Sequence, residues 1–238
     1  MLRVLVTRPE PGASRTARQL EETGFQPILL PLTETVALPV DAGLLPGAAI
    51  AVAVTSANAV RHAAKEVMAP LAGLPCHAVG KRTGEAARKA GFLSVSEGPG
   101  NAEALADSLA GDLPGRTIIY LCGRVRFALF EQRLRAAGVQ VDAVETYDTL
   151  AVGYSDEAIL ERLSGQPADA VVLYSAKAAA AMQILARRPA LQGLFEKTRF
   201  FALSARIAAA LDDTADEKIR TAAQPDEETL LALLQARL

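Results

Sequence analysis

Short apolar runs rich in β-branched residues alternate with alanine-rich stretches of helical period along nearly the whole chain. This alternation is typical of βαβ units, in which a helix carries the chain from one strand to the next parallel strand. We therefore expect an α/β fold with parallel sheets. The predicted strands are residues 3–7, 27–32, 50–56, 77–80, 93–97, 117–123, 140–146, 170–175, 199–204 and 218–222.

The distribution of these strands along the 238 residues indicates two domains. The last third of the chain has three strands, too few for a full sheet, while its beginning supplies two more and its middle supplies five. We expect a discontinuous first domain of residues 1–33 and 151–238, an inserted second domain of residues 37–145, and a connection of residues 34–36 and 146–150. Because both crossing segments have strand character, we predict two flavodoxin-like parallel-sheet domains joined by a two-stranded β connection.

Residues that favour helix ends lie at the limits of the predicted helices. Ser14 has the side chain of an N-cap at the first helix, and Asn101 has one at a helix in the second domain. Glycine favours the position just beyond a helix, where the backbone turns left-handed. The predicted stops are Gly24, Gly91, Gly111 and Gly138.

Composition excludes several classes of partner. A net charge of −2 and a pI near 5.8 give no basic footprint for duplex nucleic acid, and 5% aromatic residues without tryptophan give no stacking platform for single strands. No apolar run approaches the roughly 20 residues that span a bilayer, and the N-terminus lacks a secretion signal. Cys76 and Cys122 lie in apolar runs, as reduced core cysteines do. We expect a cytoplasmic protein without nucleic-acid or membrane partners.

Several sharper catalytic motifs are also excluded. His62 and His77 form no spaced metal-ligand set with Cys76, and neither is placed for a serine-hydrolase triad. The segment that ends in Gly-Lys-Arg-Thr is not a phosphate-binding loop, because Pro75 stands at the first glycine and Arg82 interrupts the Lys-Thr pair. We therefore expect neither a metal nor a nucleotide.

A weak internal repeat relates the two predicted domains. Residues 53–59 (AVTSANA) resemble residues 172–178 (VLYSAKA), and residues 79–87 have a looser counterpart in 203–209. In open parallel sheets, ligands bind beyond the carboxyl ends of strands, where helix N-termini present N–H groups to anions. Two facing copies would form a cleft suited to a small polyanion.

The repeated segments place two kinds of side chain at these strand ends. Small hydroxyl or amide groups are Ser56, Asn58, Thr83, Ser175 and Ser204, and basic groups are Arg8, Lys81, Arg82, Arg124, Arg126, Lys177 and Arg206. Helix capping is the plain interpretation of the serines, and solvated surface charge is that of the basic residues taken singly. The matched positions of Ser56 and Ser175 favour a binding role.

Tyr147 lies in the second crossing segment, Glu-Thr-Tyr-Asp-Thr, where its side chain could face a cleft between the domains. A phenol can donate a proton to a departing hydroxyl, and general acids typically contribute around 10² to 10⁴ in rate. Packing at the hinge with the hydroxyl in water is the other interpretation.

Seven short segments, taken in order, cover nearly the full length: residues 4–9 (VLVTRP), 29–32 (LLPL), 54–60 (VTSANAV), 79–83 (VGKRT), 121–124 (LCGR), 144–147 (VETY) and 174–176 (YSA). Through them the chain resembles the uroporphyrinogen-III synthase (HemD-like) family. The resemblance implies a cofactor-free lyase, a cyclising hydro-lyase of porphyrin and haem biosynthesis. It would close hydroxymethylbilane, a linear tetrapyrrole, to uroporphyrinogen III in the interdomain cleft, inverting the terminal pyrrole ring and losing water. Hydroxymethylbilane synthase would hand its substrate over transiently. The small size and mixed surface of the chain favour a monomer.

The resemblance also implies residue roles. Tyr147 matches the tyrosine proposed to assist loss of the substrate hydroxyl, so it is the expected catalytic residue. Thr83 matches a cleft threonine, and Ser56 and Ser175 match loop serines that contact substrate carboxylates, partly through backbone amides. The expected substrate-binding residues are Arg8, Ser56, Asn58, Lys81, Thr83, Gly123, Arg124, Ser175, Ala176, Lys177, Ser204 and Arg206.

Two positions depart from the family pattern. Ile207 stands where some members have threonine, so the roles there pass to Ser204 and Arg206. Cys122 replaces a commoner arginine, which places anion binding on Arg124 or Arg126.

Two other functions fit a bilobal cleft. A non-catalytic anion- or metabolite-binding protein would bind its ligand tightly without turnover. A nucleotide-sugar transferase of two facing α/β domains would usually be longer and would show a diphosphate site.

Overall fold

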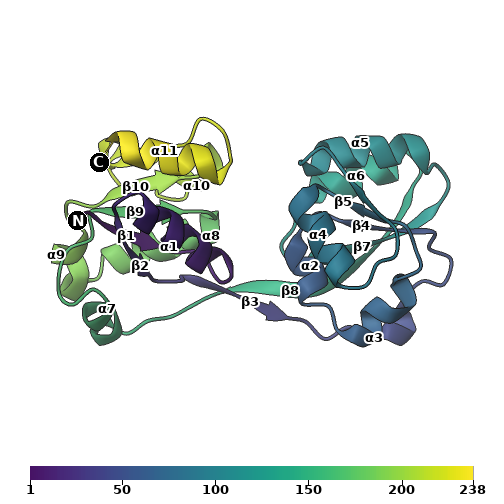
Figure 1. Ribbon diagram of the computed structural model, residues 1–238, viewed down its shortest axis with the longest axis horizontal. Helices are drawn as coiled ribbons and strands as arrows, with labels where there is room; N and C mark the ends of the chain where they lie inside the picture. The colour runs from purple at the N-terminus through teal and green to yellow at the C-terminus, as the bar shows by residue number, and fades with distance from the viewer. Residues whose placement is uncertain (238) are drawn as a thin grey trace. The chain divides into compact units, whose positions relative to one another are not determined.

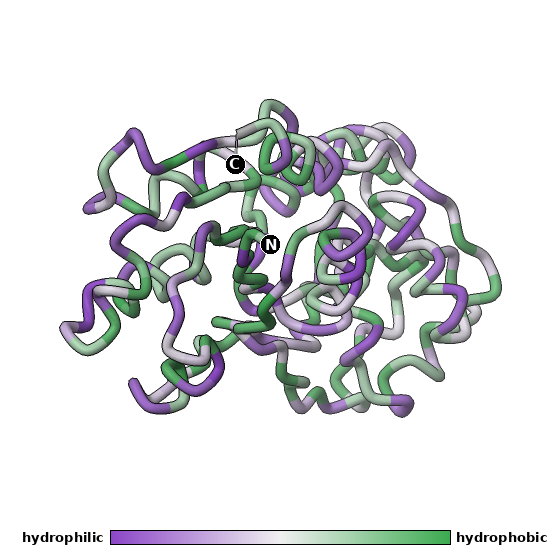
Figure 2. Tube along the Cα trace, turned by 60° about the vertical axis from the view of Figure 1, so that its left-hand side comes forward, coloured by the Kyte–Doolittle hydropathy of each residue, from purple (hydrophilic) through white to green (hydrophobic). Residues whose placement is uncertain are grey.

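The structure is a computed structural model that describes residues 1–237. It contains two compact units (Figure 1). Unit 1 comprises Met1–Glu34 together with the chain from Leu150 onward, and unit 2 comprises Thr35–Thr149. Figure 2 shows hydrophobic and hydrophilic segments alternating along the trace, the pattern that predicted buried strands between amphipathic helices.

Unit 1 is built on a five-stranded sheet with the order β11-β10-β9-β1-β2. All neighbouring pairs are parallel, and Leu5 lies opposite Ile28 on one side and Val171 on the other. Strands from the two ends of the chain therefore share one sheet. The strands are β1 (Arg3–Val6), β2 (Gln26–Leu29), β9 (Ala170–Leu173), β10 (Arg199–Ala202) and β11 (Ile219–Thr221).

Helices cover both faces of the unit 1 sheet because its strands are apolar on both sides. Val4 and Val6 share a buried cluster with α1 and α11, whereas the alternate residue Leu5 shares one with α7, α8, α9 and α10. The α-helices are α1 (Gly12–Glu22), α7 (Asp156–Arg162), α8 (Ala176–Ala186), α9 (Gln192–Phe195), α10 (Ala205–Ala208) and α11 (Glu227–Arg237), and the 3₁₀ turns are η3 (Pro189–Leu191) and η4 (Asp216–Lys218).

Unit 2 contains a six-stranded sheet with the order β3-β8-β7-β4-β5-β6. From β8 to β6 every neighbouring pair is parallel, and the β7–β8 register shifts between Cys122 and Gly123. The chain passes between the units within β3 and β8, which are neighbours in this sheet. The strands are β3 (Thr33–Ala37), β4 (Ala51–Val54), β5 (Cys76–Ala78), β6 (Val95–Glu97), β7 (Thr117–Gly123) and β8 (Gln140–Ala151).

The unit 2 sheet is also covered on both faces. Val52 and Val54 share a core with α2, α3 and α4, whereas Ala51 and Ala53 share one with α5 and α6. These elements are α2 (Ala57–Arg61), α3 (Lys65–Met68), α4 (Lys81–Lys89), α5 (Ala102–Asp112) and α6 (Ala128–Ala136), with 3₁₀ turns η1 (Ala42–Leu44) and η2 (Ala69–Leu71). No helix within residues 1–237 is long and apolar enough to cross a membrane.

The predicted α/β fold with parallel sheets is confirmed, and every predicted strand has a counterpart. Most strands end earlier than predicted. For example, β4 ends at Val54, because Thr55 and Ser56 already belong to the loop that enters α2. The strand predicted for residues 140–146 is longer, since β8 continues to Ala151 beside β3.

Two predicted helix ends are wrong. α1 begins at Gly12 rather than after Ser14, because the Gly12 and Ala13 N–H groups already turn back to the Pro9 carbonyl at 3.1 and 3.2 Å, which puts Ser14 inside the first turn. The Ser14 hydroxyl instead donates to the Glu10 carboxylate at 2.6 Å. Gly111 lies inside α5, which continues to Asp112.

The other predicted helix ends are confirmed. Asn101 accepts a hydrogen bond from the Ala104 N–H at 2.8 Å. Gly24, Gly91 and Gly138 follow helices with φ of +86°, +106° and +80°, a backbone conformation that favours glycine.

Both cysteines are free and buried, as expected. Burial raises the pKa of the Cys76 and Cys122 thiols to about 12. Because the thiolate is the reactive form, we expect iodoacetamide at pH 8 to leave both thiols unmodified in the native protein and to modify both in 8 M urea, a difference of at least about 100-fold in rate. Timed mass spectrometry measures this, and rapid native labelling of either cysteine would contradict the buried placement.

Candidate functional site

The loops after three neighbouring strands bring the predicted unit 2 residues to one edge of its sheet. Ser56 follows β4, Lys81 and Thr83 follow β5, and Arg124 follows β7. Since β4 pairs in parallel with both β5 and β7, the carboxyl ends of all three strands lie at the same edge. We call this the unit 2 carboxyl edge.

Tyr147 reaches the unit 2 carboxyl edge from β8. Its hydroxyl donates a hydrogen bond to Ser56 Oγ at 3.2 Å. Its ring lies on Gly123, where an added Cβ would be 2.6 Å from Tyr147 Cζ. The register shift between β7 and β8 pairs Gly123 with Tyr147. Glycine is therefore required here by the close approach of the ring, and the structure brings three predicted site residues together.

Ser56 also caps α2, accepting a hydrogen bond from the Asn58 N–H at 3.2 Å. The plain capping interpretation is thus correct, yet the contact with Tyr147 goes beyond it. Both bonds use Ser56 Oγ as the acceptor, and the hydroxyl also carries an O–H that can donate. Asn58 Oδ1 accepts from Arg61 Nη1 at 3.5 Å.

α4 adds anion-binding groups to the same edge. It begins at Lys81 after Gly80 and, among the described residues, no side chain caps it. Its first N–H groups and its dipole favour a carboxylate at this end. Thr83 is buried in the first turn, and Lys81 is exposed.

Carboxylates engage the two arginines beyond β7. Arg124 contacts Glu145 and Asp148, each at 3.4 Å, and its side chain remains 56% exposed. Arg126 contacts Glu131 and Glu145 and is 23% exposed. Burial opposes the charged form of Arg126, but hydrogen bonds to these two glutamates raise its pKa overall. Arg124 is therefore the more accessible of the two for an anion.

Unit 1 places its predicted residues at the carboxyl edge of its own sheet. Ser175 follows β9 and caps α8, accepting from a backbone N–H at 3.1 Å, with Ala176 and Lys177 in the first turn. Ser204 follows β10 at the start of α10, where no side-chain capping bond is found in the described part of the chain. Arg206 is exposed in the first turn of α10.

The two departures from the family pattern are core positions. Ile207 is 3% exposed and belongs to the core beneath α8 and α10. Cys122 is 1% exposed, and its thiol donates to the Val144 carbonyl at 3.6 Å. Neither residue supplies a polar group to a carboxyl edge.

Arg8, predicted to bind an anion, already has one inside unit 1. Its guanidinium lies 4.0 Å above the Tyr174 ring centroid, and its Nη1 is 2.8 Å from Glu227 Oε1. The Tyr174 hydroxyl donates to the same oxygen at 3.1 Å, and the Thr16 hydroxyl donates to it as well. Arg15 contacts the other Glu227 oxygen at 3.5 Å. Glu227 thus occupies the position that an external carboxylate would take.

Within the described part of the chain, no three or more His, Cys, Asp and Glu side chains are grouped to hold a metal ion. His62 lies instead beside Tyr147, with the ring centroids 6.1 Å apart. Burial, followed by the charge of Arg61, lowers the pKa of His62. A neutral imidazole therefore borders the Tyr147 ring at neutral pH.

The model of one protein family, described as "Uroporphyrinogen-III synthase HemD", matches residues 14–232. The chain belongs to the uroporphyrinogen-III synthase family. The match runs from inside α1 to inside α11 and so includes both units. It confirms the resemblance found in the sequence and assigns the chain to a family of haem-biosynthesis enzymes. A comparison with curated proteins gives no match.

Two solved uroporphyrinogen-III synthases share the fold. The enzyme from Helicobacter pylori 26695 is 15% identical over 99% of each chain, with a TM-score of 0.67. A mutant enzyme from the extremely thermophilic bacterium Thermus thermophilus is 19% identical over 99% of this chain and 97% of its own, with a TM-score of 0.56. At these identities the likeness shows the two-sheet α/β fold.

In this member of the uroporphyrinogen-III synthase family, two polar residues that contact Arg8 were not predicted from the sequence, namely Thr16 and Glu227. Glu227 opens a helix, where an acidic residue is ordinary. Its partner Arg8 is 219 positions away. Only the fold of unit 1 brings Arg8 and Glu227 together. The sequence around either residue therefore gives no indication of their contact.

We expect Glu227→Gln to destabilise the protein and to weaken its pH dependence. Burial alone would raise the pKa of Glu227, but the Thr16 hydrogen bond and the Arg8 and Arg15 guanidinium groups hold that pKa below the ordinary 4.5. The carboxylate therefore stabilises the fold above pH 4.5, and this contribution is lost as the pH falls through the depressed folded value.

The expected cost of Glu227→Gln is about 1–3 kcal/mol at pH 7 and less at pH 3, measured by urea unfolding at both values. The matched control is the exposed neighbour Glu228→Gln, which should change the free energy of unfolding by less than about 0.5 kcal/mol. An equal cost of Glu227→Gln at the two pH values would contradict the ion-pair role.

Proposed function

We propose that this protein is a lyase that converts hydroxymethylbilane to uroporphyrinogen III, releasing one water and inverting the terminal pyrrole ring. The observation that carries the proposal is the Tyr147 hydroxyl, held 3.2 Å from Ser56 Oγ at an edge that also presents the start of α4. Family membership supports the reaction class. In this proposal the Tyr147 hydroxyl is the proton donor, and it lies beside groups suited to carboxylates.

In this proposal Tyr147 transfers its hydrogen bond from Ser56 to the substrate hydroxyl and protonates it as it leaves as water. The methylene left behind becomes part of an electrophilic azafulvene. The substituted carbon of the pyrrole at the other end of the chain attacks it and gives a spirocyclic pyrrolenine. The original bond between the attacking carbon and its bridging methylene then breaks, and the free α-carbon of the same ring bonds to the released methylene, which inverts the ring. The proton lost from that α-carbon returns to the Tyr147 phenolate. No electron acceptor is needed.

Control of conformation is the larger task, because a free bilane closes by itself to the type I isomer. We propose that both units bind the acidic side chains of one substrate molecule and hold it bent. Ser56 and the first N–H groups of α4 would act from unit 2, and Ser175, Ala176 and Lys177 would act from unit 1. Such positioning accelerates a reaction by orientation, and backbone donors stabilise charge as it develops.

The test is a coupled assay in which the purified protein receives freshly generated hydroxymethylbilane. Chromatography of the oxidised products separates the type I and type III isomers. We expect type III to dominate. Formation of type I alone, at the rate of the buffer control, would overturn the proposal, and tight binding of the bilane without turnover would favour a binding protein instead.

A further inference from the structure

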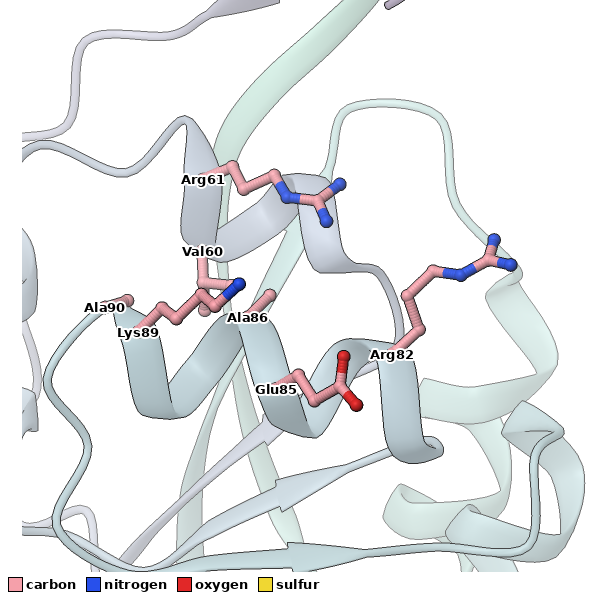
Figure 3. A pocket seen from close by; sticks show the side chains of 7 residues that line it. All are labelled: Val60, Arg61, Arg82, Glu85, Ala86, Lys89 and Ala90. Carbon is pink, nitrogen blue, oxygen red and sulfur yellow. The ribbon is translucent and has the colours of Figure 1, made fainter. Parts of the chain in front are cut away.

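A groove lies between α2 and α4 on the surface of unit 2 (Figure 3). Its volume is about 330 Å³. Its apolar lining consists of Val60 from α2 together with Ala86 and Ala90 from α4 and its end. This size is near the lower end of the roughly 300–1,000 Å³ found for small-molecule sites. The groove can therefore take one small ring rather than a large ligand.

The charged lining of the groove is mainly basic. Arg61, Arg82 and Lys89 also line the groove, and Glu85 supplies one carboxylate (Figure 3). Arg61 and Lys89 are exposed. Since the whole chain carries a net charge of −2, this excess of positive charge is local. It favours a ligand with more than one negative group.

The two helices that form the groove, α2 and α4, both begin at the unit 2 carboxyl edge. Arg61 donates to Asn58 Oδ1, and Asn58 is in the first turn of the helix that Ser56 caps. At about 1.5 Å per residue, Arg61 lies roughly 7–8 Å along the helix from Ser56. Arg82 directly precedes Thr83 in the first turn of α4. A ligand anchored at Ser56 and at the first N–H groups of α4 could therefore extend one part into the groove.

We propose that the groove between α2 and α4 binds one pyrrole ring of the linear tetrapyrrole, together with the acetate and propionate arms of that ring. The proposal rests on the proposed function and deepens it. The apolar lining suits the ring, the basic side chains suit the two carboxylates, and Glu85 accepts from the pyrrole N–H. Ring binding here adds to the control that holds the substrate bent.

The first test is a nuclear magnetic resonance titration of the ¹⁵N-labelled protein with porphobilinogen, a monopyrrole that carries one acetate and one propionate. We expect amide shifts on α2 and α4, and about three- to tenfold weaker binding in Arg61→Gln/Lys89→Gln. The control is Arg116→Gln/Lys197→Gln, which removes the same charges before β7 and β10, at the opposite ends of the strands. It should bind like the wild type.

The second test measures kcat and KM with hydroxymethylbilane. We expect Arg61→Gln/Lys89→Gln to raise KM about three- to tenfold and the control to leave it unchanged. The absence of monopyrrole shifts on α2 and α4, or equal affinities in the two double variants, overturns the groove assignment whether or not the protein is active. Type I product alone from the wild type overturns the proposed function, and the titration then decides the groove on its own.

Discussion

A Gly123→Ala variant is expected to form type III product about 100-fold more slowly than the wild type. The added Cβ would lie 2.6 Å from Tyr147 Cζ and 2.9 Å and 3.0 Å from Cε2 and Cε1 of the same ring. These distances are well inside van der Waals contact, so the ring must move and carry its hydroxyl away from Ser56. Overpacking of this kind also costs about 1–3 kcal/mol of stability.

The isomer assay and a urea melt, run on the same preparation, separate loss of activity from loss of fold. The matched control is Gly111→Ala in α5, where, apart from the adjacent residues and the helix's own backbone, no atom of the described residues lies within 4 Å of an added Cβ. Because alanine favours a helix interior over glycine, this control should keep full activity and gain stability. A wild-type rate in Gly123→Ala would show that the position of the Tyr147 ring is unimportant for turnover.

Tyr147→Phe is expected to lower kcat by about 10²- to 10³-fold with little change in KM, as removal of a general acid does. The substitution removes one oxygen, and its hydrogen bond to Ser56 contributes about 0.5–1.5 kcal/mol to stability. The variant should therefore remain folded at 25 °C. The measurement is the rate of type III formation at saturating bilane.

Tyr154→Phe provides the same chemical change in unit 1, outside the Tyr147–Ser56 pair, because the Tyr154 hydroxyl donates to the Pro31 carbonyl at 2.9 Å. It should keep the wild-type kcat. If Tyr147→Phe also kept it, the Tyr147 side chain would be a packing residue on Gly123 and the proton donor would have to be sought elsewhere.

The strands were predictable from the sequence where the apolar run itself sets the limits. Residues 117–123 are buried along most of their length and are strand from end to end, as predicted. The limits fail where tertiary pairing decides them. Residues 146–150 have strand character and were predicted as a separate connection, but pairing beside β3 makes them one strand with residues 140–146, so β8 continues to Ala151.

The same distinction applies to the candidate site. Ser56 was predictable because it lies at the end of a predicted strand. Tyr147 was predictable because it lies in a segment that resembles the family. The contact between Tyr147 and Gly123 was not, since it depends on the register shift between β7 and β8. The engagement of Arg126 by Glu131 and Glu145 and that of Arg8 by Glu227 likewise depend on residues brought together by the fold.

The arrangement of the unit 1 sheet determines the order in which the chain can fold during synthesis on the ribosome. Arg3 of β1 donates its N–H to Asp169, which is translated 166 residues later. At about 5–20 residues per second, that delay is roughly ten to thirty seconds. During it the apolar β1 has one open edge, which invites pairing with other chains, while all of unit 2 emerges. β1 can therefore complete its pairing only after unit 2 has been synthesised and the β9 segment has emerged.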